Sequence, residues 1–329
     1  MQPVIALEKL TVRLRTRAGT FDAVADLDLA VRSKEVLALV GESGCGKSMT
    51  ALAIMRLLPE PPAAIVAGAI RFGDLDLAQA DERALSRLRG NRIGMIFQEP
   101  MSSLNPAMRA GRQVAEALEL HKQMSRSEAR EAVEALFELV RISDPRRRYD
   151  DYPHQMSGGM RQRVVIALAL ACGPELLIAD EPTTALDVTT QAQILDTFRD
   201  LQARLGTATI LITHDFGVVA ETADRVAVMY AGRIVEQAPV EALFEAPLHP
   251  YSRGLLGSIM PVKDGHAARQ LAEIPGMVPA LWALPAGCAF APRCPFAVAA
   301  CREQRPPLTD AGPERKVACW RADEIRGAA

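Results

Sequence analysis

The chain has 329 residues, of which 49% are hydrophobic and 24% are charged, and its formal net charge is −2. This length predicts two domains or one large one, and the small net charge excludes a general electrostatic affinity for nucleic acid. The N-terminus lacks the charged and then apolar pattern of a secretion signal. The longest apolar run, residues 164–172, is far shorter than the roughly 20 residues that span a bilayer. We therefore expect a cytosolic protein.

The first 60 residues predict an antiparallel sheet followed by a phosphate-binding loop. Apolar and polar residues alternate in 4–16 and again in 26–31, as is typical of half-buried strands. Phe21 lies between these strands, where it could stack on an adenine ring or pack as an ordinary strand aromatic. An apolar run at 36–40 then leads into Gly-Glu-Ser-Gly-Cys-Gly-Lys-Ser, residues 41–48. Because a helix-compatible run follows at residues 49–58, the order strand, glycine loop, helix fits a phosphate-binding loop.

The chemistry of this loop suits a nucleotide. Its glycines let the backbone turn tightly and direct several N–H groups at one anion, and the following helix N-terminus adds partial positive charge. Lys47 can reach β- and γ-phosphates, and the hydroxyl of Ser48 can ligate Mg²⁺. The alternative is a glycine-rich turn that binds nothing.

Strands and helices alternate from residue 36 to 230, which predicts an α/β parallel sheet. A strand and turn are predicted at 69–77. A further strand at 93–97 ends at Gln98, a position that often carries ligand-binding groups but can also be a simple polar terminus. Residues 108–140 have helical periodicity with a break near 124–125, so we expect a helical insertion there.

Further polar residues follow at predicted helix and strand ends. Ser157, Gly158 and Gly159 open an apolar helix, either as a second anion-binding N-terminus or as an ordinary cap. The next strand ends in Asp180 and Glu181. After a phosphate loop, such an Asp can hold Mg²⁺ through water and such a Glu can orient or deprotonate water; otherwise both are surface charges.

One more strand is predicted at 208–213, and it ends at His214. A histidine at this edge can contact a γ-phosphate or a water molecule, or it can be a lone surface residue.

Together these segments resemble an ATP-binding cassette (ABC) ATPase. In chain order they resemble its Walker A loop (41–48), Q-loop (Gln98), signature (157–159), Walker B strand (Asp180 and Glu181), D-loop (185–187) and switch histidine (His214). The resemblance implies a P-loop NTPase core with an antiparallel β subdomain and an inserted helical subdomain at about 99–163. That core would occupy residues 1–245, followed by a small cysteine-containing extension at 246–329. It also implies a head-to-tail dimer with each ATP held between the loop of one subunit and the signature of the other.

The resemblance further implies a role for each matching residue. Residues expected to contact ATP are Gly41, Ser43, Gly44, Cys45, Gly46, Lys47, Ser48, Met49, Phe21, Ser157, Gly158, Gly159 and Asp187. Residues expected to serve Mg²⁺ are Ser48, Gln98 and Asp180, while Glu181, His214 and Gln98 are expected to take part in hydrolysis. The usual adenine-stacking aromatic is replaced by Ala18, which leaves Phe21 as its substitute.

Other segments resemble the dipeptide and oligopeptide importers within this family. These are residues 97–106, the signature with Met160, residues 249–256, and the tail from 274 to 320. The resemblance implies an ATP-hydrolysing subunit of a bacterial peptide importer at the cytosolic face of the inner membrane. Its expected partners are a paralogous ATPase, two membrane permease subunits and, indirectly, an external peptide-binding protein, with no nucleic acid. Nickel or glutathione import, a non-transport cassette ATPase and a non-hydrolysing regulator are the alternatives; Glu181 argues against the last.

Four of the six cysteines lie near the C-terminus, spaced C-x₅-C-x₆-C-x₁₇-C at Cys288, Cys294, Cys301 and Cys319. The segment has few apolar runs, and a small unit of this kind generally needs a staple. Disulfides are unusual in the cytosol, so the thiols suit zinc or an iron–sulfur cluster. The wide spacing favours a structural [4Fe-4S] cluster. The resemblance implies the same, since peptide importers have these four cysteines and some members are held to carry a four-iron cluster there. Zinc and four unligated buried thiols are the alternatives.

Overall fold

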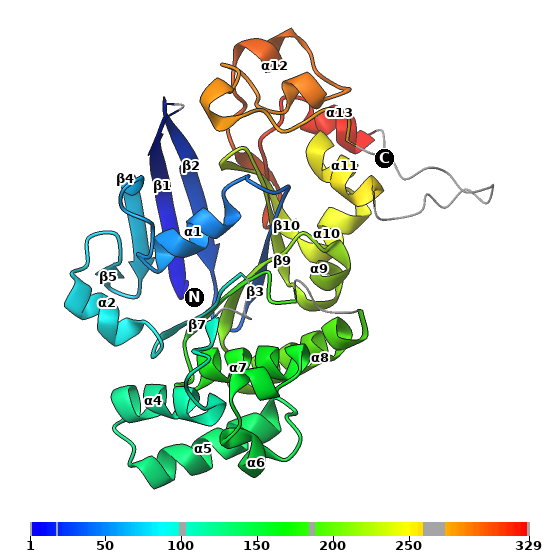
Figure 1. Cartoon of the computed structure of the whole chain (residues 1–329). Coiled ribbons are helices and arrows are strands. Elements are labelled where there is room, and N and C mark those ends of the chain that lie inside the picture. Colours follow the sequence, from blue (N-terminus) through cyan, green and yellow to red (C-terminus); the bar gives the residue numbers. More distant parts are fainter. Residues whose placement is uncertain (1, 18, 99–102, 184–187, 259–273, 328–329) are drawn as a thin grey trace, which may run out of the picture. The chain divides into compact units, whose positions relative to one another are not determined.

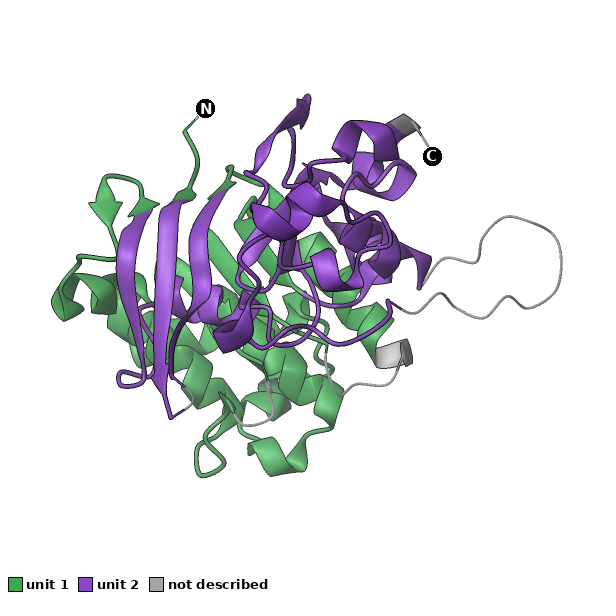
Figure 2. Ribbon diagram, turned by 90° about the horizontal axis from the view of Figure 1, so that it is seen from above, with its two compact units in different colours: residues 1–6, 30–36, 71–212 green, residues 7–29, 37–70, 213–329 purple. Residues whose placement is uncertain are grey.

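The computed structural model describes residues 2–17, 19–98, 103–183, 188–258 and 274–327. The chain forms two compact units, which are coloured separately in Figure 2. Unit 1 comprises residues 1–6, 30–36 and 71–212, and unit 2 comprises residues 7–29, 37–70 and 213–329. Among the described residues, no helix is both long and apolar enough to cross a membrane.

Unit 2 holds most of a small sheet and part of a larger one. The small sheet has the order β2-β1-β4, with β1 (Ile5–Thr16), β2 (Gly19–Val31) and β4 (Ala63–Phe72). In the larger sheet, β3 (Val36–Val40) runs parallel to β9 (Arg225–Tyr230), which pairs antiparallel with β10 (Arg233–Pro239). All five residues of β3 are buried, which explains why this strand is a continuous apolar run.

The C-terminal extension adds two strands to this sheet. Strand β12 (Arg315–Val317) pairs antiparallel with β10, and β11 (Thr309–Gly312) pairs with β12. The helices of unit 2, labelled in Figure 1, are α1 (Lys47–Ile54), α9 (Phe216–Thr222), α10 (Val240–Glu245), α11 (Pro250–Gly257), α12 (Ala299–Glu303) and α13 (Ala322–Gly327). Its short 3₁₀ turns are η2 (Leu281–Ala283) and η3 (Ala291–Arg293).

Unit 1 contains three parallel strands in the order β8-β7-β6: β6 (Ile93–Ile96), β7 (Leu176–Asp180) and β8 (Ala208–Ile212). Its helices are α2 (Glu82–Leu88), α4 (Ala110–Lys122), α5 (Arg126–Leu139), α6 (Pro145–Tyr149), α7 (Gly158–Leu170) and α8 (Val188–Leu205), with a 3₁₀ turn η1 (Pro153–Gln155). Helices α4, α5 and α7 pack against one another (Figure 1). A short strand β5 (Leu75–Asp76) pairs antiparallel with the end of β4.

The two predicted helices of 108–140 are confirmed, and a capping box explains the break between them. The Ser125 N–H donates to the Glu128 carboxylate at 2.8 Å, and the Ser125 hydroxyl accepts from the Glu128 N–H at 3.4 Å. This arrangement satisfies backbone groups that the first turn of α5 would otherwise leave unpaired.

Two predicted strand starts were placed too late. Strand β2 begins at Gly19 rather than 26, and β4 begins at Ala63 rather than 69. In β2, Asp26 adopts a φ of 52°, so the buried residues on its two sides do not share one alternating pattern. In β4, four of the first six residues are exposed, including the apolar Val66, so they give little periodic signal. The helix after the phosphate loop also ends earlier than predicted, at Ile54 rather than 58.

Candidate functional site

The glycine loop, residues 41–48, joins the end of β3 to the start of α1. Gly41 and Gly46 have φ angles of 153° and 109°. A Cβ on Gly41 would lie 2.2 Å from the carbonyl oxygen of Met229, and one on Gly46 would lie 2.5 Å from that of Ala23. Glycine is therefore required at both positions, since any side chain would strike backbone. Gly44 has a φ of 78°, and a Cβ at this position would meet no neighbouring atom. Glycine is therefore favoured here by the backbone conformation and not by close packing.

Lys47 lies inside the curve of this loop. The residue is 7% exposed, and its Nζ donates to the carbonyl oxygens of Gly41 at 2.7 Å and Glu42 at 3.1 Å. Ser43 and Gly44 are exposed on the outer rim, and Ser48 is half-buried in the first turn of α1. The loop thus combines the fixed ammonium group of Lys47, an exposed backbone and a helix N-terminus, which together can bind a polyphosphate.

In unit 1 the two predicted carboxylates lie at the end of strand β7. Asp180, the last residue of the strand, is 3% exposed, while Glu181 is half-buried with a φ of 49°. The Glu181 N–H donates to the carbonyl of Ile212 on β8 at 2.9 Å, which fixes the backbone there. Gln98 Nε2 donates to Glu181 Oε2 at 3.4 Å, so the structure brings together two predicted residues 83 positions apart. An amide and carboxylates at one sheet edge can hold a hydrated Mg²⁺ and polarise water.

The Ser-Gly-Gly segment is the start of helix α7. Ser157 is the N-cap, and its hydroxyl accepts the N–H of Met160 at 3.3 Å, while Gly158 and Gly159 lie half-buried in the first turn. The sequence did not indicate that the next two polar residues of α7, Gln162 and Arg163, are buried and bound to distant backbone. Gln162 is buried and donates to the carbonyl of Pro182, and Arg163 is buried and donates to that of Val140 at 2.6 Å. Gln162 thus connects α7 to the segment after the two carboxylates.

His214 is exposed two residues beyond β8, immediately before the Asp215 cap of α9. Met49 lies half-buried in α1. Asp187 and the rest of the predicted D-loop, as well as Ala18, lie outside the described residues.

Phe21 contacts an aromatic residue that no sequence pattern places beside it. Its ring centroid is 5.7 Å from that of Trp282 in η2, with the two planes at 56°. Trp282 is 60% exposed. Phe21, which is half-buried, therefore forms an aromatic pair with the exposed Trp282, and the pair joins strand β2 to the C-terminal extension.

A second missed feature is a clamp on Glu42, the second residue of the glycine loop. Arg293 donates to the two carboxylate oxygens of Glu42 at 2.7 and 3.0 Å. The Arg293 side chain is 4% exposed, and this pairing raises its pKa further above the usual range for arginine. The Glu42 N–H donates to the hydroxyl of Tyr251 at 2.8 Å. Tyr251 also packs edge-on against Tyr230, so residues of the C-terminal part of the chain fix both the side chain and the backbone of Glu42.

Behind this clamp, Glu236 is fully buried and accepts hydrogen bonds from the N–H groups of Leu248 and His249, both at 2.9 Å, and from Arg315 at 3.0 Å. The ring of His249 caps α11 by accepting the Tyr251 N–H at its Nδ1, at 3.1 Å. Burial lowers the pKa of His249 to about 3, so the ring is neutral at physiological pH.

The four C-terminal cysteines are free, and all four line one small cavity in unit 2, together with His249 and Phe290. The backbones of Cys288 and Cys301 are paired by an N–H to carbonyl hydrogen bond of 2.8 Å. Burial, with the neighbouring thiols, raises the pKa of Cys319 to about 11 and raises those of Cys288 and Cys294. Within the described residues, no group of three or more His, Cys, Asp or Glu side chains is placed to hold a single metal ion.

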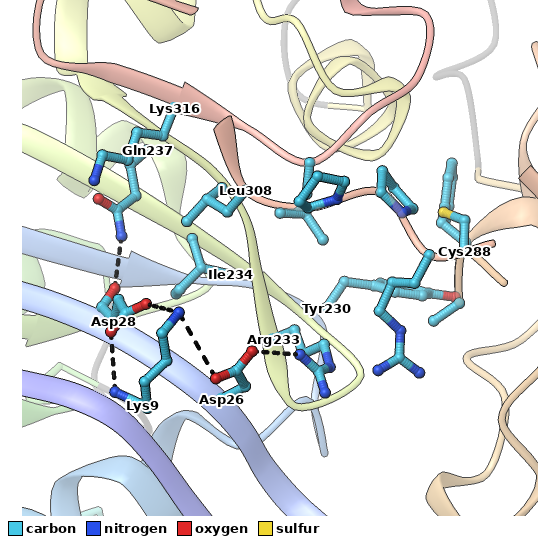
Figure 3. A pocket seen from close by; sticks show the side chains of 17 residues that line it. Lys9, Asp26, Asp28, Tyr230, Arg233, Ile234, Gln237, Cys288, Leu308 and Lys316 are labelled. Carbon is cyan, nitrogen blue, oxygen red and sulfur yellow. Dashed lines mark hydrogen bonds and ion pairs between the residues drawn. The ribbon is translucent and has the colours of Figure 1, made fainter. Parts of the chain in front are cut away.

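A larger pocket of about 320 Å³ lies between strands β1, β2 and β10 and the extension, all within unit 2 (Figure 3). Two of its cations pair with its two carboxylates: Lys9 pairs with Asp28 at 2.6 Å and with Asp26 at 3.7 Å, and Arg233 pairs with Asp26 at 3.5 Å, while Arg305 and Lys316 also line the pocket. The pocket therefore does not present these two cations to a ligand.

Similarity to known proteins agrees with the geometry. Residues 24–184 match the family model described as ABC transporter. A peptide ABC transporter ATP-binding protein of Sinorhizobium fredii is 56% identical over 92% of this chain and 90% of its own length. The chain belongs to the ABC transporter family. In this ABC ATPase, residues 235–301 also match the model described as the C-terminal region of oligopeptide/dipeptide transporters.

Two Bacillus subtilis relatives of this ABC ATPase are named for transport of peptides. The dipeptide transport ATP-binding protein DppD is 48% identical over 98% of this chain and 96% of its own. The oligopeptide transport ATP-binding protein OppD is 48% identical over 96% of this chain and 88% of its own. Among solved structures, the dimeric ATP-binding cassette MJ0796 bound to ADP and Pi is similar, with a TM-score of 0.64 and 26% identity over 72% of this chain and 98% of that one. The predicted ABC cassette fold is thus confirmed.

Proposed function

We propose that this ABC ATPase powers the import of dipeptides or oligopeptides across the bacterial inner membrane. The observation that carries the proposal is the match of residues 235–301 to the C-terminal region of peptide transporters. Relatives named for dipeptide and oligopeptide transport support it, because they are similar over nearly the whole chain and not only over the cassette.

The roles of individual residues are those that the resemblance to ABC ATPases implies. Lys47 and the loop amides bind the triphosphate of ATP, Glu181 activates water, and His214 senses the γ-phosphate. Residues that serve Mg²⁺ are Ser48, Gln98 and Asp180, and residues that serve the nucleotide of the second ATPase are Ser157, Gly158, Gly159 and Asp187. The contact between Gln98 and Glu181 supports the shared role of these two side chains in positioning water and metal.

The subunit works with partners at the cytosolic face of the membrane. These are a paralogous ATPase, which completes two nucleotide sites, and two permease subunits, with an external binding protein that delivers the peptide. We expect weak ATPase activity from this chain alone and strong activity after assembly. Full activity in a chain that light scattering shows to be monomeric would contradict the shared sites.

A transport assay tests the cargo and the chemistry together. A strain lacking this subunit should fail to take up labelled di- and oligopeptides, and the parent chain should restore uptake while Glu181→Gln should not. Loss of a positioned base typically lowers the rate by about 10²–10⁴-fold, and the variant should still bind ATP. Glu175→Gln is the matched control, since Glu175 lies just before β7 and pairs with Arg92 at the surface. Loss of nickel or glutathione uptake instead of peptide uptake would reassign the cargo.

We also propose that Cys288, Cys294, Cys301 and Cys319 hold a structural [4Fe-4S] cluster. All four thiols line one cavity. They are separated by five, six and seventeen residues, which is wider than the two to four residues between the paired cysteines of usual zinc sites, and in a four-iron cluster each thiolate binds a separate iron. The spacing therefore favours a cluster over zinc. When bound, the group would cross-link four segments of the extension.

Iron and sulfide analysis, with visible absorption, on anaerobically purified protein tests this proposal. About four irons per chain are expected from the cluster stoichiometry, and Cys301→Ser should lose them. Cys172→Ser is the control, since this buried thiol lies outside the cavity. Stoichiometric zinc without iron would favour the single-ion alternative, and an ordered extension without metal would show that the thiols only pack.

A further inference from the structure

Trp282 is a large aromatic side chain left open to solvent. It is 60% exposed, and among the described residues its ring contact is with Phe21, at 5.7 Å between centroids. The other tryptophan, Trp320, donates its indole N–H to the carbonyl of Gln304 at 3.1 Å, whereas no such bond is found for Trp282 in the described part of the chain. An amphipathic ring in this setting is typical of a contact surface for another flat group.

The segment that carries Trp282 begins beside the glycine loop. Arg293, which clamps Glu42 of that loop, also donates to the carbonyl of Pro275 at 3.0 Å and to that of Ile274 at 3.4 Å. Seven residues after Pro275 the chain reaches Trp282 and Phe21. One end of this segment is thus tied to the phosphate loop, and its other end forms the aromatic pair.

Strand β2 gives the distance between the loop and the pair. The backbone of Gly46 lies directly against Ala23, because a Cβ on Gly46 would be 2.5 Å from the Ala23 carbonyl oxygen. Phe21 is two residues before Ala23 on the same strand, which corresponds to about 7 Å along the strand axis. A ribose and an α-phosphate bridge a gap of this size between a base and a bound triphosphate.

We propose that Trp282, with Phe21, forms the platform on which the adenine ring of ATP stacks, so that the C-terminal extension completes the nucleotide site. The inference rests on the proposed binding of ATP by the loop. Trp282 is the larger and more exposed of the two rings, so the indole supplies the flat surface. Stacking uses the π-face that every base has, so this contact strengthens nucleotide binding without choosing between adenine and guanine.

The test compares ATP with inorganic triphosphate, which has phosphates and no base. In a Trp320→Phe background Trp282 is the only tryptophan, and ATP should quench its fluorescence while triphosphate should not. With EDTA present to prevent hydrolysis, Trp282→Ala should weaken ATP binding by about 5- to 150-fold and leave triphosphate binding unchanged. Trp282→Phe should restore most of the loss, and Met277→Ala, a neighbour that is 88% exposed, should have no effect.

Equal affinity of the parent and Trp282→Ala for ATP would overturn the inference. So would an equal loss of ATP and triphosphate binding, since that would show a distorted loop and not a missing base contact. A parent chain that binds neither ligand would overturn the phosphate site itself, and the inference with it. Unfolding midpoints of all variants, measured in parallel, distinguish lost contacts from lost folding.

Discussion

Arg293→Met should destabilise the chain and loosen the phosphate loop from a distance of 251 residues in sequence. Methionine keeps the buried stem but removes both charged hydrogen bonds to Glu42 and the bonds to Pro275 and Ile274. Removing one partner of a buried pair typically costs about 3–5 kcal/mol. Glu42 keeps 29% of its side chain exposed and can regain water, so we expect a loss of about 2–4 kcal/mol in the free energy of unfolding.

A double-mutant cycle measured by urea unfolding gives the coupling energy between Arg293 and Glu42. Its four proteins are the parent, Arg293→Met, Glu42→Gln and the double variant. The coupling energy from this cycle should be about 1.5–3 kcal/mol, the range for hydrogen bonds to charged groups. Arg141→Met is the control, because Arg141 pairs with Asp200 while both side chains are more than half exposed, and such pairs contribute below about 1 kcal/mol. Binding of ATP and of triphosphate should weaken together in Arg293→Met. A change below about 0.5 kcal/mol, or a coupling energy near zero, would refute the clamp.

Three further outcomes are expected. Gly46→Ala should lower the free energy of unfolding by about 2 kcal/mol or more and abolish triphosphate binding, because its Cβ would strike Ala23. In the control Gly44→Ala the new Cβ meets no neighbouring atom, so the loss should be only about 1 kcal/mol. Arg163→Met should cost about 2 kcal/mol in urea unfolding, since it leaves the Val140 carbonyl unpaired inside unit 1; a neutral result would contradict this. The pKa of His249 is about 3 in the folded chain and about 6.5 in the unfolded chain, so the unfolded state binds the proton first as pH falls. The free energy of unfolding should therefore drop by about 1 kcal/mol from pH 7 to 5.5. His249→Asn keeps a cap acceptor for α11 and should remove this contribution to the pH dependence of stability.

The sequence by itself determined the phosphate loop and the strand ends. The loop could be predicted because its strand, glycines and helix are contiguous, and each glycine is required by local conformation or by close backbone packing. The position of Glu181 could be predicted because buried parallel strands are continuous apolar runs, and their polar ends are easily located. The break between α4 and α5 could also be predicted, because the cap formed by Ser125 and Glu128 involves only neighbouring residues.

Tertiary structure alone decided which distant residues meet. No local pattern indicates that Arg293 reaches Glu42, or that Trp282 lies on Phe21, because these contacts depend on how the extension folds back within unit 2. A lone Arg and an isolated Trp in a proline-rich tail have no periodicity that would mark them as partners of the loop. Four spaced cysteines likewise suggest a shared ligand, but only the fold gathers them around one cavity. Local backbone chemistry therefore determined where the phosphate-binding loop lies, and long-range packing determined what supports it.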